Sequence, residues 1–498
     1  MFFKRFYDTK LAQASYLIGC QQTGDALVVD PNRDVEQYVT AADAEGLRIA
    51  FVTETHIHAD FVSGSRELAA RTGAQLLLSD EGDAEWKYAY AADAKARLLK
   101  DGDSFMVGNV RIEALHTPGH TPEHLSFVVT DTPAAAGPWG ILTGDFVFVG
   151  DVGRPDLLEK AAGIAGTMEA GARTLFASLA RFRALPDHLQ VWPGHGAGSA
   201  CGKALGAVPS STVGYEKAAN WALGIADEAT FVREVLADQP EPPRYFAQMK
   251  RINREGPRVL GAVPRPPRKG ADALTALVRE KATIVDTRAA AQFAAGHVPG
   301  TLNIPLTGSF VTWAGWLLPY DRDLYLIVDD TRPDAAQAAA RDLAMIGLDR
   351  VAGVFGHDAL ASWTAGSALE TVAQTTPREL APLLARGEAA VIDVRAASEW
   401  EAGHLPGVPN IPLGQLADRI AELPTDRPVV LQCQSGARSA IAASLLQAHG
   451  VTRVVNLAGG FSGWRDAGLP VEQGGEVRTA PVAAPIGVPS AAAATVRA

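Results

Sequence analysis

Thr55-His56-Ile57-His58-Ala59-Asp60-Phe61 is the stretch of sequence that decides the fold of the N-terminal part of the chain. It directly follows an apolar run at residues 49–52, which predicts a short buried strand, so the stretch forms the loop where that strand ends. Two imidazoles and a carboxylate so close together can help to build a metal site. The alternative interpretation, a polar loop with ordinary surface histidines, is weakened by three later segments.

These segments supply matching polar groups. They are His116-Thr117-Pro118-Gly119-His120-Thr121, Thr143-Gly144-Asp145 and Pro193-Gly194-His195-Gly196. Each has a glycine beside the polar group, which permits a tight backbone turn. Strand, polar loop and helix alternate up to about residue 200, and this pattern predicts two sheets flanked by helices.

The order H-x-H-x-D, P-G-H, G-D and G-H resembles the metallo-β-lactamase superfamily over roughly the first 240 residues. The resemblance implies an αββα sandwich with a metal centre. One position departs from the pattern, because the dinuclear zinc hydrolases of the superfamily have a histidine where this chain has Phe61. Since phenylalanine cannot bind a metal, the resemblance implies a mononuclear centre.

Residues 53–65 and Gly153-Arg154-Pro155-Asp156 resemble the persulfide dioxygenase branch of that superfamily. This resemblance implies one non-haem Fe(II) per chain, held by His56, His120 and Asp145. Such a triad leaves coordination positions open for O2 and a substrate sulfur. Five neighbouring groups are then expected to orient the ligands or to hydrogen-bond the substrate: His58, Asp60, His116, His124 and His195.

Two further residues are expected at the substrate. Arg154 is a candidate for gripping the anionic part of a thiol carrier, with an ion pair to Asp156 or Asp151 as the alternative. Cys201 lies in a glycine-rich segment after His195, and it either faces the iron pocket or has a packing role. The family has a tyrosine near this segment and this chain does not, so the sequence does not name the carrier thiol.

Length and composition narrow the class of protein. The chain has 498 residues, which indicates about three domains, and its net charge of −11 without a basic stripe argues against binding nucleic acid or an anionic membrane. Cys20, Cys201 and Cys433 are widely separated and do not form a disulfide framework, which fits a reducing compartment. Without a long apolar run or a signal peptide at residues 1–8, we expect a soluble cytoplasmic protein.

An internal repeat organises the C-terminal half. Asp286, His297 and Pro305 recur as Asp393, His404 and Pro412 at a constant spacing of 107 residues, which indicates tandem domains. Both copies resemble rhodanese domains, which are single-sheet α/β modules. The expected layout is therefore an α/β multidomain chain with these parts: an iron domain (1–255), a Pro- and Arg-rich linker (256–270), a first rhodanese-like copy (271–368), a second copy (374–475) and a disordered tail (476–498).

The second copy carries the candidate nucleophile. Cys433 follows an apolar strand and precedes a helix, so inward N–H groups, the helix N-terminus and Arg438 are expected to favour its thiolate and its use as a sulfur carrier. The rest of the loop would cradle sulfite or thiosulfate: Gln434, Ser435, Gly436, Ala437 and Ser439. A phosphatase is the competing use of this spacing, but the flanking GHLPGVPNIP and GGFSGW segments favour sulfur transfer.

The first copy is expected to be inactive. Aligning residues 326–329 on residues 429–432 puts Asp330 where Cys433 stands and Ala335 opposite Arg438. Both the nucleophile and the cation are then missing. A degenerate copy of this kind would position the catalytic domains or form a homo-oligomer.

The whole layout resembles the persulfide dioxygenase–sulfurtransferase fusions of bacterial sulfide detoxification. The resemblance implies oxidation of a thiol persulfide by O2 to sulfite, followed by transfer of a sulfane sulfur from Cys433 to sulfite, which gives thiosulfate. One alternative is a dinuclear zinc thioester hydrolase of the glyoxalase II kind, against which Phe61 counts. Another is a non-enzymatic persulfide sensor or sulfur carrier with Cys20 and Cys201 as redox thiols.

Overall fold

The computed structural model describes residues 1–157, 159, 166–203 and 205–474. The predicted disordered tail at 476–498 therefore lies outside the described residues. The chain divides into two compact units. Of the described residues, one unit comprises those within 1–268, 306–324 and 330–354, and the other comprises 269–305, 325–329 and 355–474.

Two six-stranded sheets form the N-terminal domain. The first runs in chain order, β1 (Phe2–Asp8), β2 (Gln13–Cys20), β3 (Asp25–Val29), β4 (Arg48–Thr53), β5 (Gln75–Ser79) and β6 (Arg97–Leu99). The second has the order β14 (Ser211–Thr212), β13 (Gln190–Pro193), β10 (Gly140–Gly144), β9 (Leu125–Asp131), β8 (Val110–His116) and β7 (Ser104–Val107). A short hairpin pairs β11 (Val147–Phe148) with β12 (Asp151–Val152).

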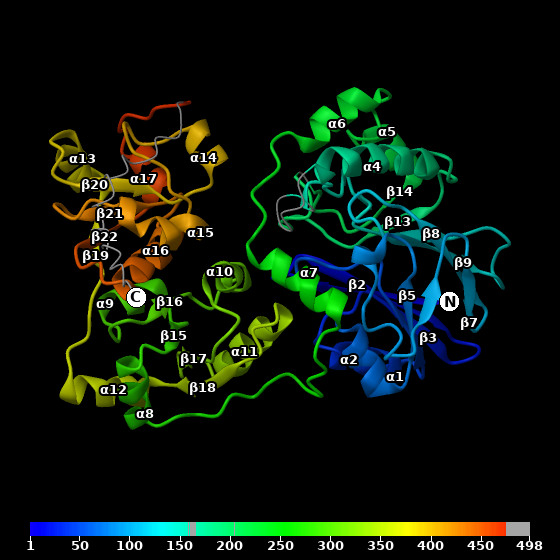
Figure 1. Cartoon of the computed structure of the whole chain (residues 1–498), viewed down its shortest axis with the longest axis horizontal. Coiled ribbons are helices and arrows are strands. Elements are labelled where there is room, and N and C mark those ends of the chain that lie inside the picture. Colours follow the sequence, from blue (N-terminus) through cyan, green and yellow to red (C-terminus); the bar gives the residue numbers. More distant parts are fainter. Residues whose placement is uncertain (158, 160–165, 204, 475–498) are drawn as a thin grey trace, which may run out of the picture. The chain divides into compact units, whose positions relative to one another are not determined.

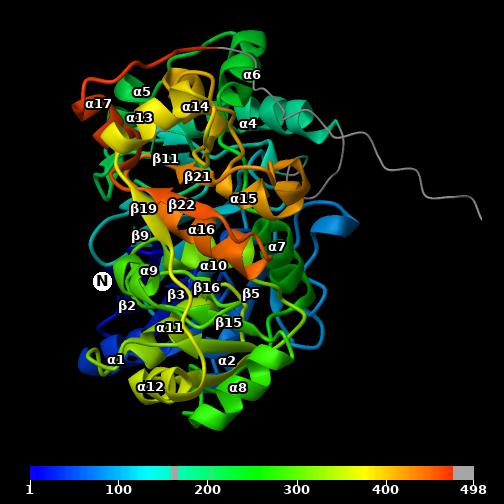
Figure 2. The same cartoon turned by 90° about the vertical axis from the view of Figure 1, so that its left-hand side faces the viewer.

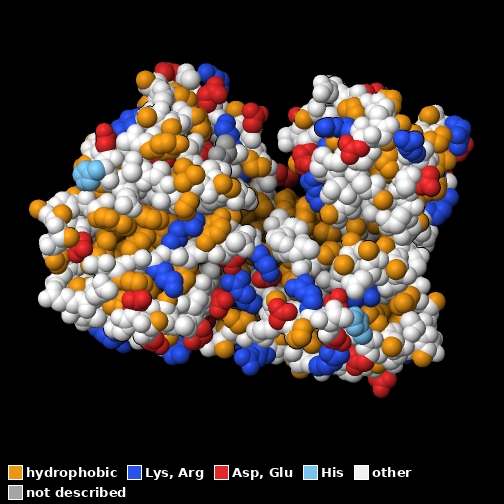
Figure 3. All heavy atoms as spheres, turned by 180° about the vertical axis from the view of Figure 1, so that it is seen from behind, with side chains coloured by type: hydrophobic (Ala, Val, Ile, Leu, Met, Phe, Trp, Pro, Cys, Tyr) orange, Lys and Arg blue, Asp and Glu red, His pale blue; other side chains and the backbone are white. Residues whose placement is uncertain are grey.

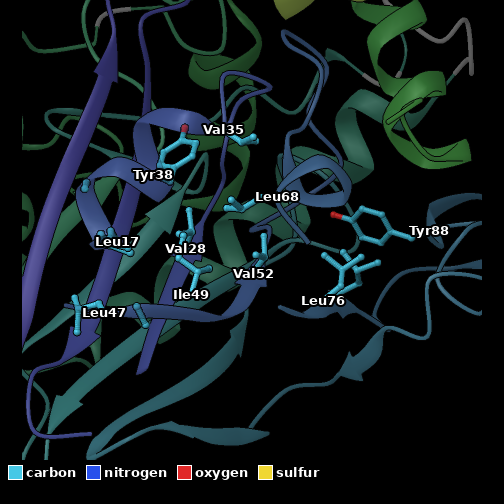
Figure 4. Close-up of a cluster of buried hydrophobic side chains, with 14 of the residues drawn as sticks. Leu17, Val28, Val35, Tyr38, Leu47, Ile49, Val52, Leu68, Leu76 and Tyr88 are labelled. Carbon is cyan, nitrogen blue, oxygen red and sulfur yellow. The ribbon is translucent and has the colours of Figure 1, made fainter. Parts of the chain in front are cut away.

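Helices cover the outer faces of these sheets (Figure 1). They are α1 (Glu36–Ala44), α2 (Ser65–Thr72), α4 (Thr167–Arg183), α5 (Val213–Ala219), α6 (Glu228–Leu236) and α7 (Tyr245–Glu255), with a 3-10 turn at Ala84–Trp86. Leu17 and Val28 point from the first sheet toward α1 and α2, where Figure 4 shows them packed with Tyr38 and Leu68. Neighbouring residues such as Leu27 point the opposite way, into the core between the sheets. The predicted αββα sandwich is confirmed.

Two helices of the first rhodanese-like copy, α10 (Phe310–Leu317) and α11 (Ala335–Met345), belong to the same compact unit as the N-terminal domain. The Val62 N–H, beside the His/Asp loop, donates to the carbonyl oxygen of Met345 at 2.7 Å. The Arg341 guanidinium lies 2.7 Å from Asp8 and 3.0 Å from Asp34. Helix α11 thus contacts the N-terminal domain through partly buried charge pairs as well as through a backbone hydrogen bond.

Replacing Arg341 with alanine should loosen this contact. The substitution leaves the buried Asp8 carboxylate without its cation, and for a partly exposed arginine we expect a loss of about 2 kcal/mol. Amide hydrogen exchange across α11 in the full chain should then speed up by about 30-fold. The matched control is Arg350→Ala, because Arg350 pairs with Asp323 at the surface and such pairs contribute about 1 kcal/mol or less. Equal exchange in the two variants would contradict the assignment.

The Pro- and Arg-rich segment contains no helix or strand between residues 256 and 267, but it is not free. Leu260 and Gly261 donate their N–H groups to the Glu67 carboxylate at 2.6 and 2.7 Å. The carbonyl oxygen of Arg258 accepts from Arg33 at 2.8 Å. The segment is therefore held along the N-terminal domain.

Each rhodanese-like copy has one four-stranded sheet. The first has the order β16 (Leu302–Asn303), β15 (Thr283–Asp286), β17 (Leu324–Ile327) and β18 (Val351–Phe355), with α8 (Ala271–Arg279), α9 (Ala290–Ala295) and α12 (His357–Gly366) as its further helices. The second has the order β19 (Ala373–Thr375), β22 (Val454–Leu457), β21 (Val429–Gln432) and β20 (Ala390–Asp393), all parallel. Its helices are α13 (Pro377–Ala385), α14 (Ala397–Ala402), α15 (Leu413–Leu416), α16 (Ala437–Ala448) and α17 (Gly460–Asp466), with a 3-10 turn at Ala417–Glu422. Figure 2 shows α16 against β21 and β22.

The repeated residues build the same network in both copies. Arg395 pairs with Asp393 at 2.7 Å and donates to the carbonyl oxygen of Gly403, and Arg288 does the same with Asp286 and Gly296. His404 stacks on Trp400 at 3.8 Å, as His297 stacks on Phe293 at 3.7 Å. These residues therefore hold loops in place, in line with the scaffold role expected for Asp393, Arg395 and His404.

The alignment of the two copies needs a correction. The N–H of Thr287 donates to the carbonyl oxygen of Ile327, and the equivalent N–H of Val394 donates to Gln432. Val328, not Asp330, is therefore the counterpart of Cys433, and the predicted register was wrong by two residues. The long apolar run at residues 324–328 allows both registers in sequence, because only the pairing of strands distinguishes them. Valine cannot carry sulfur, so the first copy still has no nucleophile at this position.

Among the described residues, no helix has the length and apolar character needed to cross a bilayer. On the face that Figure 3 shows, Lys and Arg side chains are interspersed with Asp and Glu and form no continuous basic tract.

Candidate functional site

The polar segments of the N-terminal domain all begin where a strand ends. β4 leads into the His56 loop, β8 ends at His116, β10 ends at Gly144 and β13 ends at Pro193. The loops approach closely, because a Cβ added at Gly144 would lie 2.5 Å from Thr55 Oγ1, and this glycine also has a φ of 48°.

His56, His120 and Asp145 meet in this cluster. One possible ligand atom from each lies within 4.8 Å of the others, and all three side chains are buried. Asp145 Oδ2 is 3.9 Å from His56 Nε2 and 3.5 Å from His120 Nε2. The structure thus brings together the three residues that the sequence proposed as metal ligands.

Hydrogen bonds on the far side of each ring fix its proton. His120 Nδ1 lies 3.0 Å from the carbonyl oxygen of Arg154, which can only accept, so Nδ1 carries the hydrogen. His56 Nδ1 lies 3.0 Å from Thr55 Oγ1, whose own hydrogen goes to Asp30. Burial lowers the pKa of His120, and burial together with the charge of His58 lowers that of His56. Both rings are therefore neutral, with an Nε2 lone pair facing Asp145.

The three donors fit a single divalent metal ion. Asp145 Oδ2 is buried and has no hydrogen-bond partner among the described residues. Burial raises the pKa of Asp145, but the cationic ring of His195, which donates a hydrogen bond to Oδ1, outweighs that effect and holds the pKa well below its usual range. An anionic oxygen and two lone pairs with no proton between them require a cation. Two imidazoles and one carboxylate are also the ligand set of mononuclear Fe(II) oxygenases.

A second polar group lies next to this centre. His195 bridges two carboxylates, with Nδ1 2.7 Å from Asp145 and Nε2 2.8 Å from Asp60. Burial lowers the pKa of His195, but Asp145 and Asp60 outweigh it and hold the pKa well above its usual value. Cys201 Sγ lies within 4.8 Å of the same Asp60 and His195 atoms, and burial raises the pKa of its thiol. The thiol that sequence placed either in the pocket or in the core thus contacts groups around the centre.

Phe61 and His58 complete the loop. Phe61 is buried, and its ring centroid lies 4.4 Å from that of His58. His58 Nε2 lies 3.1 Å from Asp30, and although burial lowers the pKa of His58, Asp30 raises it to about 9. His58 is therefore held as a cation by Asp30.

Sequence reasoning missed Asp30. Its carboxylate accepts from the Thr55 N–H at 2.6 Å and from the Thr55 hydroxyl at 2.9 Å, in addition to its contact with His58. It thereby orients His56 through Thr55. The only signal in the sequence was a single aspartate at the end of the apolar run 26–29.

Arg154 does not match the expected role. Its side chain is fully buried, and its guanidinium donates four hydrogen bonds, to Asp156 and to the carbonyl oxygens of Ala200 and Pro240. The geometry corresponds to the alternative, an ion pair with Asp156. The expectation that this guanidinium grips an anionic carrier is not supported, because its side chain is fully buried and four of its five N–H donors go to protein acceptors.

The Cys433 loop sits between β21 and α16. Cys433 Sγ accepts from the N–H of Gly436 at 3.2 Å and lies 3.5 Å from the Ser439 hydroxyl. The carbonyl oxygen of Cys433 accepts from the N–H of Phe461, at the start of α17. A Cβ at Gly460 would lie 2.2 Å from that oxygen, so the GGFSGW segment needs its glycine to hold the loop.

The other residues of the Cys433 loop have partners other than the sulfur or are exposed. The Arg438 guanidinium forms a bidentate pair with Glu399, at 2.6 and 2.7 Å, a partner that the sequence did not reveal. The Gln434 amide donates to Ser462, whereas Ser435 and Ala437 are exposed. Gly436 and Ser439 are thus the predicted loop residues that contact the sulfur, and the charge of Arg438 is balanced by Glu399.

Comparison with known proteins agrees with this architecture. The metallo-beta-lactamase superfamily model matches residues 8–195, and the rhodanese-like domain model matches residues 270–356 and 376–467. The crystal structure of a metallo-beta-lactamase from Staphylococcus aureus is 45% identical, covers 71% of this chain and 99% of that chain, and has a TM-score of 0.66. The chain therefore belongs to the metallo-beta-lactamase superfamily. It carries two rhodanese-like domains in its C-terminal half.

Curated relatives match parts of the chain. A hydroxyacylglutathione hydrolase of Polaromonas is 34% identical over 36% of this chain and 61% of its own length. The mitochondrial persulfide dioxygenase ETHE1 of Bos taurus is 27% identical over 39% of this chain and 67% of its own length. The first curated matches are covered over only 62% of their length, so the enzyme-family domains are clear but the activity of the whole protein is a matter for proposal.

Proposed function

We propose that the protein is a bifunctional enzyme of sulfide detoxification that oxidises low-molecular-weight thiol persulfides and forms thiosulfate. In the first reaction RSSH, O2 and H2O give RSH, sulfite and two protons. The observation that carries the proposal is the set of His56, His120 and Asp145, together with Phe61 at the position where a second metal would need a histidine. Similarity to a persulfide dioxygenase supports the same reading.

The chain's own residues prepare the oxidation site. Fe(II) bound by the three ligands would supply open coordination positions for O2 and sulfur and the electrons for oxygen activation. Asp30 and Thr55 orient His56, and the carbonyl oxygen of Arg154 orients His120. Asp60, His195 and Cys201 line the polar side of the centre, where a persulfide would lie.

The second reaction uses Cys433. Its thiolate takes the sulfane sulfur of a persulfide, and sulfite then attacks that terminal sulfur, so that the Cys433 S–S bond breaks and thiosulfate leaves. Because sulfite is the product of one site and the acceptor at the other, fusion of the domains raises its local concentration. Three free cysteines fit a reducing cytoplasm as the compartment.

Metal content and oxygen consumption test the proposal. Protein purified without added metal should contain about one iron per chain and should take up O2 when a persulfide is added. A thioester hydrolase is the second candidate, favoured by the 34% identity to a hydroxyacylglutathione hydrolase and by the nearby Asp60, His195 and Cys201. Two zinc ions per chain with thioester hydrolysis would establish that candidate, and iron without oxygen uptake would indicate a sensor or carrier.

A further inference from the structure

A groove of about 400 Å3 lies beside the Cys433 loop, within the second compact unit. One wall is helix α9 of the inactive copy, which presents four alanines: Ala290, Ala291, Ala294 and Ala295. The opposite wall includes Gly436 and Ala440 of the catalytic copy. Ala291 and Ala295 are exposed, so the groove opens to solvent along α9. The inactive copy thus contributes surface next to the nucleophile of the active one.

The groove adjoins the Cys433 loop through Gly436. Gly436 lines the groove, and its N–H donates to Cys433 Sγ at 3.2 Å. The N–H of Val372, another lining residue, donates to the carbonyl oxygen of Ala294, which fixes α9 against this edge of the catalytic copy. These two hydrogen bonds therefore fix α9 and the Cys433 loop on either side of the same groove.

One buried polar atom in the groove lacks a partner. Asn456 lines the groove and is only 6% exposed, and its Nδ2 donates to Gln374 at 2.9 Å. Its Oδ1 has no hydrogen-bond partner in the described part of the chain. An unsatisfied buried carbonyl costs free energy, and it would accept an N–H from a bound molecule.

We propose that this groove binds the carbon skeleton of the thiol persulfide that delivers sulfur to Cys433, with Asn456 Oδ1 accepting an N–H of the carrier. The inference rests on the proposed sulfur transfer. The described lining residues are alanine, glycine and valine with two neutral amides, so the groove is uncharged. The volume and the amide acceptor fit a thiol of amino-acid or short-peptide type. The inactive copy thereby takes part in choosing the sulfur donor.

The transfer step is a simple displacement. The Cys433 thiolate attacks the outer sulfur of RSSH, the new Sγ–S bond forms, and the S–S bond of the donor breaks. The electron pair leaves with RS⁻, which departs through the groove, and no external oxidant or reductant is required.

Filling the groove tests the proposal. Ala291→Phe and Ala295→Phe substitute exposed positions of α9 in the full chain, and sulfur transfer to cyanide is measured without oxygen, so that the donor is not oxidised. We expect the KM for glutathione persulfide to rise by about ten-fold or more, while turnover with thiosulfate, which has no carbon skeleton, stays within about two-fold. Ala361→Phe, at an exposed position of α12 outside the groove, is the matched control and should change neither donor.

The outcomes are distinct. An unchanged KM in both α9 variants, or an equal loss with both donors, overturns the groove assignment. If the unaltered protein transfers sulfur from neither donor, the proposed function itself fails. Asn456→Ala adds a second measurement, because it should raise the KM for glutathione persulfide but not for the persulfide of 2-mercaptoethanol, which has no N–H to donate. An equal change for these two donors overturns the role of Asn456.

Discussion

Replacing Asp145 with alanine should abolish iron binding and persulfide-dependent oxygen uptake, while thiosulfate:cyanide sulfur transfer continues. Asp145 supplies the carboxylate of the three-residue set, and its Oδ2 faces both Nε2 lone pairs. Even groups that only orient ligands cost about 10–100-fold in metal affinity when removed, so loss of the anionic ligand should cost more than about 100-fold. Iron content, oxygen uptake and sulfur transfer are measured on the same preparation.

A matched control separates ligand loss from general damage. Asp187 pairs with Lys217 at 2.6 Å, but its side chain is 74% exposed, so Asp187→Ala removes a carboxylate of the same domain at little cost. That variant should retain iron and oxygen uptake. If uptake survives in Asp145→Ala, the metal is held elsewhere, and the group of Asp60, His195 and Cys201 becomes the site to examine.

The sequence was informative about the metal cluster because each ligand follows a strand. Apolar runs such as residues 49–52 identify strands, and loops that follow strands of one domain gather at its edges. The glycines beside His120, Asp145 and His195 marked the tight turns that let these loops approach. Sandwich, tandem copies and cluster could therefore be predicted from local pattern.

The sequence could not reveal partners that are distant along the chain. Asp30 hydrogen-bonds Thr55 and His58, and Glu399 pairs with Arg438. No spacing or motif in the sequence indicates these contacts. Arg154 shows the converse problem, because a guanidinium in a family motif can give most of its hydrogen bonds to protein acceptors. The role of a charged side chain depends on which acceptors the fold places around it.

The contact between α11 and the N-terminal domain is another long-range contact that the sequence did not reveal. The first copy was expected to be inactive, and its lack of a nucleophile at Val328 agrees with that, but its sequence did not show what its surfaces contact. Two of its helices now have structural partners. α11 is tied to Asp8 and Val62 of the N-terminal domain, and α9 lines the groove beside Gly436. The first copy thus provides contact surfaces that its sequence alone did not reveal.

Replacing Cys433 with serine should leave sulfite as the end product in place of thiosulfate. Serine preserves the size of the side chain and can still accept from Gly436, so the loop should keep its conformation. A hydroxyl cannot carry a sulfane sulfur under these conditions, because its proton is held far more tightly than that of a thiol. Oxygen uptake should be unchanged, while the ratio of thiosulfate to sulfite falls by at least about ten-fold.

Variants of the other two cysteines show whether Cys433 itself carries the sulfur. Cys20→Ser is the matched control, because Cys20 is a buried thiol at the end of β2 whose sulfur accepts from the Asn109 N–H, and this variant should make thiosulfate normally. Cys201 lies beside Asp60 and His195, so it is the remaining thiol that could replace Cys433. If thiosulfate persists in Cys433→Ser but disappears in Cys201→Ser, the sulfur is carried at the metal centre. If it persists even when both are replaced, the coupling of the two reactions through a protein persulfide is wrong.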